Sequence, residues 1–413
     1  GNLLIPPLLG YNAGEQWFWV TLGFIITAVA IPIIGIMAHA KLQGTMYDFG
    51  KKVSPWFSSI YCIIIYAISV AIPSPRTASA THEIAIYPAF ETDPFWTSLV
   101  YFALVLVFVL NRSKILNIIG KFLTPLIVIM LLLVIGIGLY NSSLANLATF
   151  DTPIVSGILE GYQTFDAIGA VVVGAFIIVS LKFKTIDIEA YEAKKSLIRK
   201  AGLIAGLGLF VIYSGLISVG AYYGTEISVD TTLGNDMQRA NLLRSISISA
   251  LGTFGNTVLS VLISLACFTT AVGIVAGTSD YFRSLFSSSN KVYIITAIIA
   301  CIAGVGVGQI DFHSIIVIAY PVLLFIYPIT IVLIILNVLP KRSATPLVFK
   351  AVVIVTFIFS IPDVIGVIEP LKHLKDNFMF IPLAKHSLGW MLPALLVFVL
   401  INIFQKSKPH SSS

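Results

Sequence analysis

Long apolar runs alternate with short polar stretches along the whole chain. Eleven of these runs are long enough for a helix to cross a bilayer, which takes about 20 residues. They fall near residues 16–40, 57–88, 94–111, 114–140, 154–181, 200–223, 255–286, 292–310, 313–339, 347–368 and 388–405. The pattern predicts an all-α, polytopic membrane protein.

The chain opens on an apolar stretch that cannot be one uninterrupted helix. Residues 1–10 read GNLLIPPLLG, with two adjacent prolines and an amide. A proline inside a helix frees backbone groups, and freed backbone at membrane depth survives only where it is buried in protein or lines a polar cavity. We therefore expect a polar ligand at Gly1 and Asn2. The alternative is that Pro6 and Pro7 simply begin a helix, where proline is favoured, and that Gly1 and Asn2 form a loop.

Composition supports the membrane class. Of the 413 residues 57% are hydrophobic and 11% are charged, whereas a soluble domain carries roughly 25% charged residues. The three cysteines, Cys62, Cys267 and Cys301, lie inside apolar runs without metal-ligand spacing, so we expect small core residues and no redox chemistry.

The basic residues predict an orientation in the membrane. Nineteen of the 25 Lys and Arg residues fall in alternate loops, and such loops face the cytoplasm. The surplus of basic residues therefore indicates orientation in the membrane and not a nucleic-acid partner. The alternation requires the opening stretch to exit outward, so we expect a first helix completed upstream of Gly1, twelve segments in all and both termini in the cytoplasm.

A second interrupted segment lies five spans after the first. Residues 160–169 read EGYQTFDAIG, with two acids, an amide and a hydroxyl at the start of an apolar run. An ionisable residue inside a membrane segment is by default a functional candidate. Breaks at corresponding positions of two halves indicate an inverted-repeat transporter with its site between them. The alternative is that Asp166 only caps the outer end of a helix and pairs with a base.

The third segment of each half carries a further anomaly. Residues 72–79 read IPSPRTAS, a kinked polar stretch with Arg76, and residues 266–273 read ACFTTAVG. The hydroxyls of Thr269 and Thr270 are hard oxygen ligands of the kind that sodium prefers. Alternatively, both threonines bond back to their own helical turn.

These stretches together carry a resemblance to a known family. Residues 1–7, 72–78, 160–167 and 266–273, in this order, resemble the branched-chain amino acid:cation symporters of bacteria, and the likeness covers essentially the whole chain. That family is taken to share the five-plus-five inverted-repeat fold of LeuT. The resemblance implies a first repeat in residues 1–153, a second in 154–340, and two additional helices with a cytoplasmic tail in 341–413.

The resemblance also implies roles for particular residues. Gly1 and Asn2 stand where backbone donors meet the substrate carboxylate and the Asn oxygen faces sodium, and Thr164 stands near the substrate and that ion. The implied substrate site comprises Gly1, Asn2, Arg76, Gly161, Tyr162, Gln163, Thr164, Phe165 and Asp166. The implied sodium ligands are Asn2, Ala266, Thr269 and Thr270. Two departures are that further ion-binding carbonyls would lie upstream of Gly1, and that Asp166 replaces a residue that is more often small and polar.

The physics of such a site is coherent for an aliphatic amino acid. A carboxylate suits the N-terminus of a half-helix, and an ammonium suits the freed carbonyls of residues 161–166 or the carboxylate of Asp166. Phe165, Ile5 and Ile168 can form a dry pocket for the side chain. Because one methylene in such a pocket discriminates by only about 1–3 kcal/mol, we expect leucine, isoleucine and valine all to be accepted.

Arg76 and Asp166 are expected to pair or to share a water network, because a lone charge at membrane depth is expensive. In the alternative arrangement Arg76 reaches the outer interface and Asp166 binds the substrate ammonium.

The sequence thus predicts a secondary importer of branched-chain amino acids, coupled to Na⁺, in the bacterial cytoplasmic membrane, and no enzyme. No Gly-x-x-x-x-Gly-Lys loop is present to bind ATP. The expected partners are the small substrate and the lipid bilayer. Two alternatives remain: proton coupling, in which Asp166 titrates or Lys121 takes the place of an ion, and a receptor or channel without coupled transport.

Overall fold

Helices form all the regular secondary structure in the described part of the chain. The computed structural model describes residues 2–111, 121, 124–140, 150–184, 190–223, 235–286 and 288–406. No strand occurs within these ranges, so the predicted all-α class is confirmed.

The elements follow the predicted apolar runs closely. The first half contains η1 (Asn2–Leu4), α1 (Ile5–Ala13), η2 (Gly14–Gln16), α2 (Trp17–Ile25), η3 (Ile26–Ala30), α3 (Ile31–Leu42), α4 (Met46–Gly50), α5 (Pro55–Ala71), α6 (Pro73–Thr81), η4 (His82–Ile86), α7 (Tyr87–Phe90), α8 (Pro94–Leu110) and α10 (Thr124–Tyr140). The second half contains α11 (Pro153–Tyr162), α12 (Asp166–Lys184), α13 (Ala190–Tyr222), α14 (Asn235–Leu285), α15 (Asn290–Val307) and α16 (Phe312–Val338). The C-terminal part contains α17 (Pro346–Ile365), η7 (Glu369–Phe378), η8 (Ala384–His386) and α18 (Met391–Lys406).

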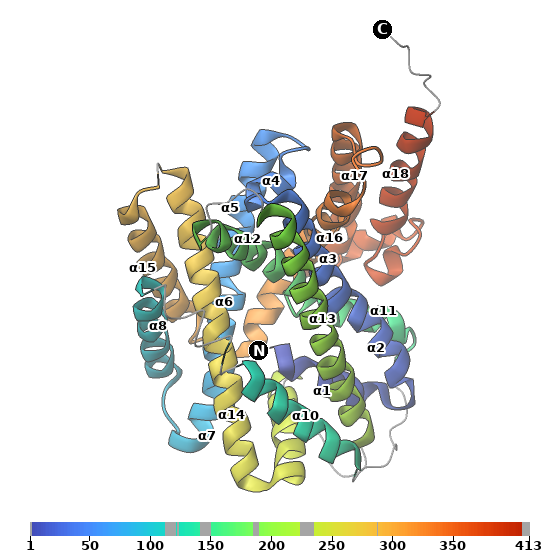
Figure 1. Ribbon diagram of the computed structural model, residues 1–413. Coiled ribbons are helices and arrows are strands. Elements are labelled where there is room, and N and C mark those ends of the chain that lie inside the picture. The colour runs from blue at the N-terminus through green and yellow to red at the C-terminus, as the bar shows by residue number, and fades with distance from the viewer. Residues whose placement is uncertain are drawn as a thin grey trace.

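Many helices in the described part of the chain are long and apolar enough to cross a membrane. Seven helical stretches are long and apolar enough to cross a bilayer, and three shorter apolar helices, α8, α10 and α18, accompany them. The number of spans, twelve, stays a prediction. In Figure 1, α4 and the end of α18 lie at one end of the bundle, and α7 lies at the other. The stretch around α4 holds Lys41, Lys51 and Lys52, so this is the end of the bundle that the charge pattern predicts to face the cytoplasm.

The contacts between helices reveal an internal repeat. Helix α1 packs along α13, and α11 packs along α2; likewise α10 contacts α13, and α16 contacts α3. Each contact maps onto its partner when every span of one half is exchanged for the span at the same position of the other half, five spans away: α1 for α11, α10 for α16, and α13 for α2 and α3. Because an odd number of spans separates the two copies, they cross the bilayer in opposite directions. The chain therefore has the predicted five-plus-five inverted-repeat architecture, whereas the boundaries 1–153, 154–340 and 341–413 stay a prediction.

The last two helices lie outside the repeat. Helix α17 packs on α16, and α18 packs on α17, so the pair forms an addition at one side of the bundle (Figure 1).

One helix departs from the sequence pattern. The apolar run near 255–286 predicts a span preceded by a polar loop, but α14 already begins at Asn235. Gly252 interrupts it with φ 70° and ψ −177°, values open mainly to glycine, so residues 235–251 form a separate helical limb. From the sequence alone this limb is too polar and too short to be recognised as a span.

The two halves of the repeat contact each other through closely packed backbone, where α13 meets α1 and α11 meets α2. A Cβ atom on Gly220 of α13 would lie 1.9 Å from the carbonyl oxygen of Pro7 in α1. In the other half, a Cβ atom on Gly157 of α11 would lie 2.1 Å from the carbonyl oxygen of Val20 in α2. Small residues at such crossings let transmembrane helices approach closely.

We expect Gly220→Ala to destabilise the protein, because the added methyl group meets backbone that cannot rotate away. Overpacking of this kind costs about 1–3 kcal/mol. Gly208→Ala on the same helix is the matched control: nothing lies within 4 Å of its Cβ position, and alanine favours a helix over glycine by about 1 kcal/mol. Thermal unfolding of the purified protein should give a lower midpoint for Gly220→Ala only. Equal midpoints for both variants would contradict the close packing.

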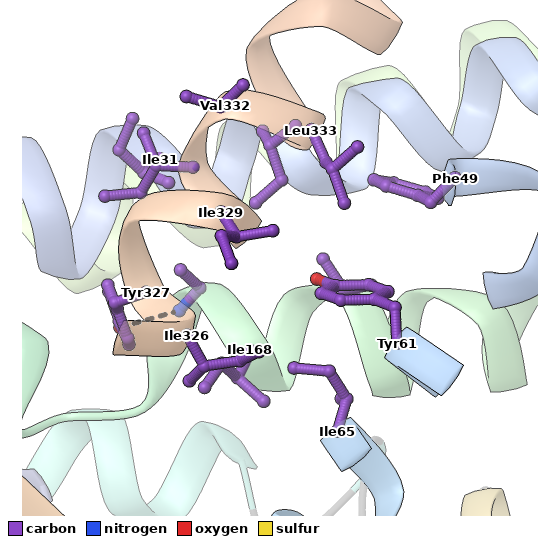
Figure 2. Close-up of a cluster of buried hydrophobic side chains, with 14 of the residues drawn as sticks. Ile31, Phe49, Tyr61, Ile65, Ile168, Ile326, Tyr327, Ile329, Val332 and Leu333 are labelled. Atoms are coloured by element: carbon purple, nitrogen blue, oxygen red, sulfur yellow. Dashed lines mark hydrogen bonds between the residues drawn. The ribbon is translucent and has the colours of Figure 1, made fainter. Parts of the chain in front are cut away.

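The largest buried cluster fixes the start of α12. Figure 2 shows Ile168 of α12 against Ile326 and Tyr327 of α16, with Ile65 and Tyr61 of α5 beside them. All five side chains are less than 4% exposed. A rigid core thus lies directly behind the second break.

Candidate substrate and ion site

The second break lies where the sequence predicts it. Helix α11 ends at Tyr162, and α12 begins at Asp166. Phe165, in the break, has φ 59°, a left-handed value that is rare for a bulky residue. The hydroxyl of Tyr327 accepts the amide of Ala167 at 3.1 Å, which gives one freed N–H group of α12 a partner. The core behind the break therefore holds this strained backbone in place.

The opening stretch combines parts of both predicted possibilities. Pro6 and Pro7 do lie in the first turn of α1, so the alternative in which they begin a helix is correct. Asn2, however, is no idle loop residue, because its Nδ2 donates to Oδ1 of Asp166 at 2.7 Å. Gly1 lies outside the described residues.

Asp166 joins three spans. Besides the bond from Asn2, its Oδ2 accepts the hydroxyl of Tyr213 in α13 at 2.9 Å, and its own amide donates to Oγ1 of Thr164 at 3.2 Å. Thr164 in turn donates to the carbonyl of Gly161 at 2.7 Å. The carboxylate lies at the N-terminus of α12, where the helix dipole favours negative charge. Polar side chains from within the bundle hold Asp166, so it is more than a cap on the outer end of a helix.

A cavity of about 300 Å³ lies between the turn at Asn2 and the break before Asp166. Its polar lining comprises Asn2, Ser69, Arg76, Thr77, Thr164, Asp166, Tyr213 and Thr270. Its apolar lining comprises Leu3, Pro73, Phe165, Ile168, Gly169, Val172, Val173, Leu209, Ile263, Ala266 and Ile274. Few polar groups on a mainly apolar wall are typical of a site for a small organic ligand.

Five residues of the predicted substrate site line this cavity: Asn2, Arg76, Thr164, Phe165 and Asp166.

The structure directs three other predicted residues elsewhere. Gly161 contacts α2 so closely that a Cβ atom would lie 1.9 Å from Oγ1 of Thr27. Tyr162 is 1% exposed and stacks on Tyr327 with ring centroids 4.5 Å apart. The side chain of Gln163 bonds to Glu160 at 3.0 Å. At the end of α11 these residues contact neighbouring side chains outside the cavity. They stabilise the break and do not line the site.

Arg76 is buried beside the break. Its side chain is 3% exposed, and one guanidinium nitrogen donates to the carbonyl of Gln163 at 2.5 Å. The alternative in which Arg76 reaches the outer interface is therefore wrong. The guanidinium gives a partner to a carbonyl that the broken helix leaves free. Direct pairing of Arg76 with Asp166 stays a prediction, although both residues line the same cavity.

Three oxygens of the predicted ion site lie together. The hydroxyls of Thr269 and Thr270 both donate to the carbonyl of Ala266, at 2.9 and 3.0 Å. These are the helix-internal bonds of the alternative interpretation. Each hydroxyl oxygen still keeps lone pairs that can face a cation. Ala266 and Thr270 line the cavity, whereas Lys121, the alternative to an ion, has an exposed side chain and is not among the described lining residues.

Sequence reasoning missed Tyr213, Tyr327 and Arg239. Both tyrosines lie in strongly apolar runs, where a buried hydroxyl needs a hydrogen-bond partner, and this is the signal that could have identified them. Arg239 lies in the polar first limb of α14, yet it is only 6% exposed.

Comparison with known proteins decides the family. The model of the branched-chain amino acid transport protein family matches residues 1–408. The chain belongs to this family. It is thus a multi-pass membrane transporter and no enzyme, in a family that transports branched-chain amino acids.

Individual relatives are similar over nearly their full length. A putative branched-chain amino acid carrier protein of Staphylococcus aureus (strain MRSA252) is 32% identical over 442 residues, which cover 99% of this chain and 94% of the relative. The branched-chain amino acid transport system 2 carrier protein of Pseudomonas aeruginosa is 31% identical over 428 residues, which cover 100% of this chain and 94% of the relative. A solved Na⁺-coupled sialic acid symporter in a substrate-bound, outward-open state gives a TM-score of 0.48 at 15% identity, over 98% of this chain and 96% of that one.

Proposed function

We propose that this member of the family imports leucine, isoleucine and valine together with Na⁺ by alternating access. The observation that carries the proposal is the cavity between the turn at Asn2 and the break before Asp166, where one carboxylate lies among apolar side chains. The substrate ammonium binds Asp166, whose two oxygens have about four acceptor positions and use two for Asn2 and Tyr213.

The substrate carboxylate binds at the start of α1. No side chain caps this helix, and Asn2 and Leu3 in the turn before it line the cavity. Pro6 and Pro7 in the first turn of α1 carry no N–H group, so the backbone donors here are those of the turn Asn2–Leu4, and the positive end of the helix dipole adds to their attraction for an anion. The aliphatic side chain then contacts Ile168, Val172 and the rest of the apolar lining. Lysine and glutamate would bring an unpartnered charge onto this wall.

Sodium binds beside the substrate in this proposal. Asn2 uses its amide nitrogen for Asp166, which leaves its oxygen for a cation. Ala266, Thr269 and Thr270 offer a second group of oxygens on α14. We place the protein in the bacterial cytoplasmic membrane with both termini in the cytoplasm, because loops rich in Lys and Arg alternate along the sequence with loops that hold few of them.

Uptake by the purified protein in proteoliposomes tests the proposal. With an inward Na⁺ gradient, labelled leucine should accumulate, and unlabelled isoleucine and valine should compete with it, whereas lysine and glutamate should not. Uptake of lysine or glutamate at a rate similar to that of leucine would contradict the proposed substrates.

Proton coupling is the second candidate, because Asp166 lines the cavity and is itself an acid. An inward pH step without Na⁺ distinguishes the two. Sodium coupling predicts no accumulation of leucine under that condition, and proton coupling predicts accumulation.

A further inference from the structure

Arg239 closes a buried polar cluster at the end of α11. One of its guanidinium nitrogens lies 2.9 Å from Oε2 of Glu160 and 3.1 Å from Oε1 of Gln163. Gln163 completes the set by donating to Oε1 of Glu160 at 3.0 Å. The side chain of Arg239 is 7% exposed, and that of Glu160 is 26% exposed.

The cluster connects the end of α11, which is packed into the bundle, to the first limb of α14, which is linked to the rest of its helix through one glycine. Glu160 and Gln163 belong to the broken helix of the substrate site, whereas Arg239 lies on the first limb of α14. Gly252 connects that limb to the rest of α14 with a left-handed φ, and nothing lies within 4 Å of its Cβ position. A single uncrowded residue is thus the point about which the limb can turn.

The cluster also separates two cavities. Glu160, Gln163 and Arg239 line a second cavity of about 260 Å³ together with Ile316 and Tyr320 of α16. The substrate cavity begins just beyond, at Thr164, and the two share no described lining residue. Arg76, a residue of the substrate cavity, binds the carbonyl of Gln163 from the other side. The end of α11, with Gln163 just after it, therefore separates the two cavities. Arg76 bonds to it from the substrate cavity, and Arg239 bonds to it from the second cavity.

The geometry points to Arg239 as the residue that closes the outer path of the transport cycle. Its ion pair with Glu160 holds the limb of α14 over the end of α11, and the pair separates before substrate can enter from outside. Arg239 is shielded from water and Glu160 is partly shielded, so each charge is stable there only while the other pairs with it, and loss of either partner favours the state in which the survivor is better hydrated. This role rests on the transport function proposed above.

Reactivity of an introduced cysteine tests the closure without any substrate. Ile316, which is 6% exposed, lines the second cavity, and the three native cysteines are buried. In an Ile316→Cys background, Arg239→Gln and Glu160→Gln should each raise the rate of modification by a water-soluble methanethiosulfonate by roughly tenfold. The double variant should react no faster than either single one, because one pair can be broken only once.

Two further variants separate closure from loss of folding. Arg239→Lys keeps the charge and should lie near the parent rate, and so should the exchanged pair Arg239→Glu with Glu160→Arg. The exposed pair of Lys372 and Glu369 is the matched control, and Lys372→Gln should change nothing. Parent-like rates in both single Gln variants, or single effects that multiply in the double variant, would overturn the role of Arg239. Leucine uptake by the parent protein reports separately on the proposed function.

Discussion

Asp166→Ala should lower the apparent affinity for leucine by roughly 30-fold or more. Truncating one partner of a buried, hydrogen-bonded charge pair costs about 2–5 kcal/mol, and each 1.4 kcal/mol is tenfold. Here the lost partner is the only carboxylate among the described lining residues of the cavity, and the amide of Asn2 and the hydroxyl of Tyr213 lose their acceptor with it. The concentration dependence of labelled leucine uptake in proteoliposomes measures the effect.

Tyr213→Phe is the matched control for Asp166. It removes one hydrogen bond to the carboxylate but keeps the ring, which packs edge-on against Phe24 with centroids 5.3 Å apart. The net value of one hydrogen bond to a charged group is about 1.5–3 kcal/mol at most, so the affinity should fall less than in Asp166→Ala. An Asp166→Ala protein that folds and keeps the parent affinity would remove Asp166 from the substrate site.

Replacement of Thr269 or Thr270 by Ala should raise the Na⁺ concentration for half-maximal uptake by roughly tenfold or more, equivalent to about 1.4 kcal/mol. Each hydroxyl supplies a directed oxygen, and neither Cys267 nor Phe268 beside Ala266 can replace it. Because ion and substrate stabilise the same closed arrangement, the apparent affinity for leucine should fall too, and high Na⁺ should partly restore it.

Two controls decide whether the threonines act as ligands. Thr→Ser at either position keeps the oxygen and should be mild. Thr278→Ala, on the same helix, removes a hydroxyl that is 3% exposed and donates to the carbonyl of Ile274 at 2.8 Å, so it reports the cost of losing a helix-internal bond alone. If Thr269→Ala and Thr270→Ala kept the Na⁺ dependence of Thr278→Ala, the ion site would lie elsewhere and Asp166 with a proton would be the next candidate.

The spans and the break before Asp166 could be predicted from sequence because they depend on local properties. Hydrophobic length predicts a span, Pro6 and Pro7 predict an irregular start, and the polar run around Asp166 predicts a break. The repeat was also predictable, because it follows from the five-span offset between the proline-containing opening stretch and the polar run around Asp166. None of this requires knowing which side chains meet.

The partners within the site depend on contacts far apart in sequence. Asn2 and Asp166 are 164 residues apart, and Arg239 is 79 residues from Glu160. Hydropathy does not show that Tyr213 turns toward Asp166, because the run around it is apolar on all sides. Likewise, Tyr162 and Gln163 belong to the predicted polar stretch, yet the pitch of α11 directs their side chains to neighbouring helices. Spacing alone could not separate residues that line the cavity from those that support it.

A structure of the protein with leucine and Na⁺ bound reports directly on where the substrate lies. We predict leucine in the cavity between α1 and α12, with its ammonium within hydrogen-bond distance of Asp166 and its side chain against Ile168. Leucine bound at another place, with Asn2 and Asp166 still bonded across a cavity that holds no amino acid, would contradict the proposed site.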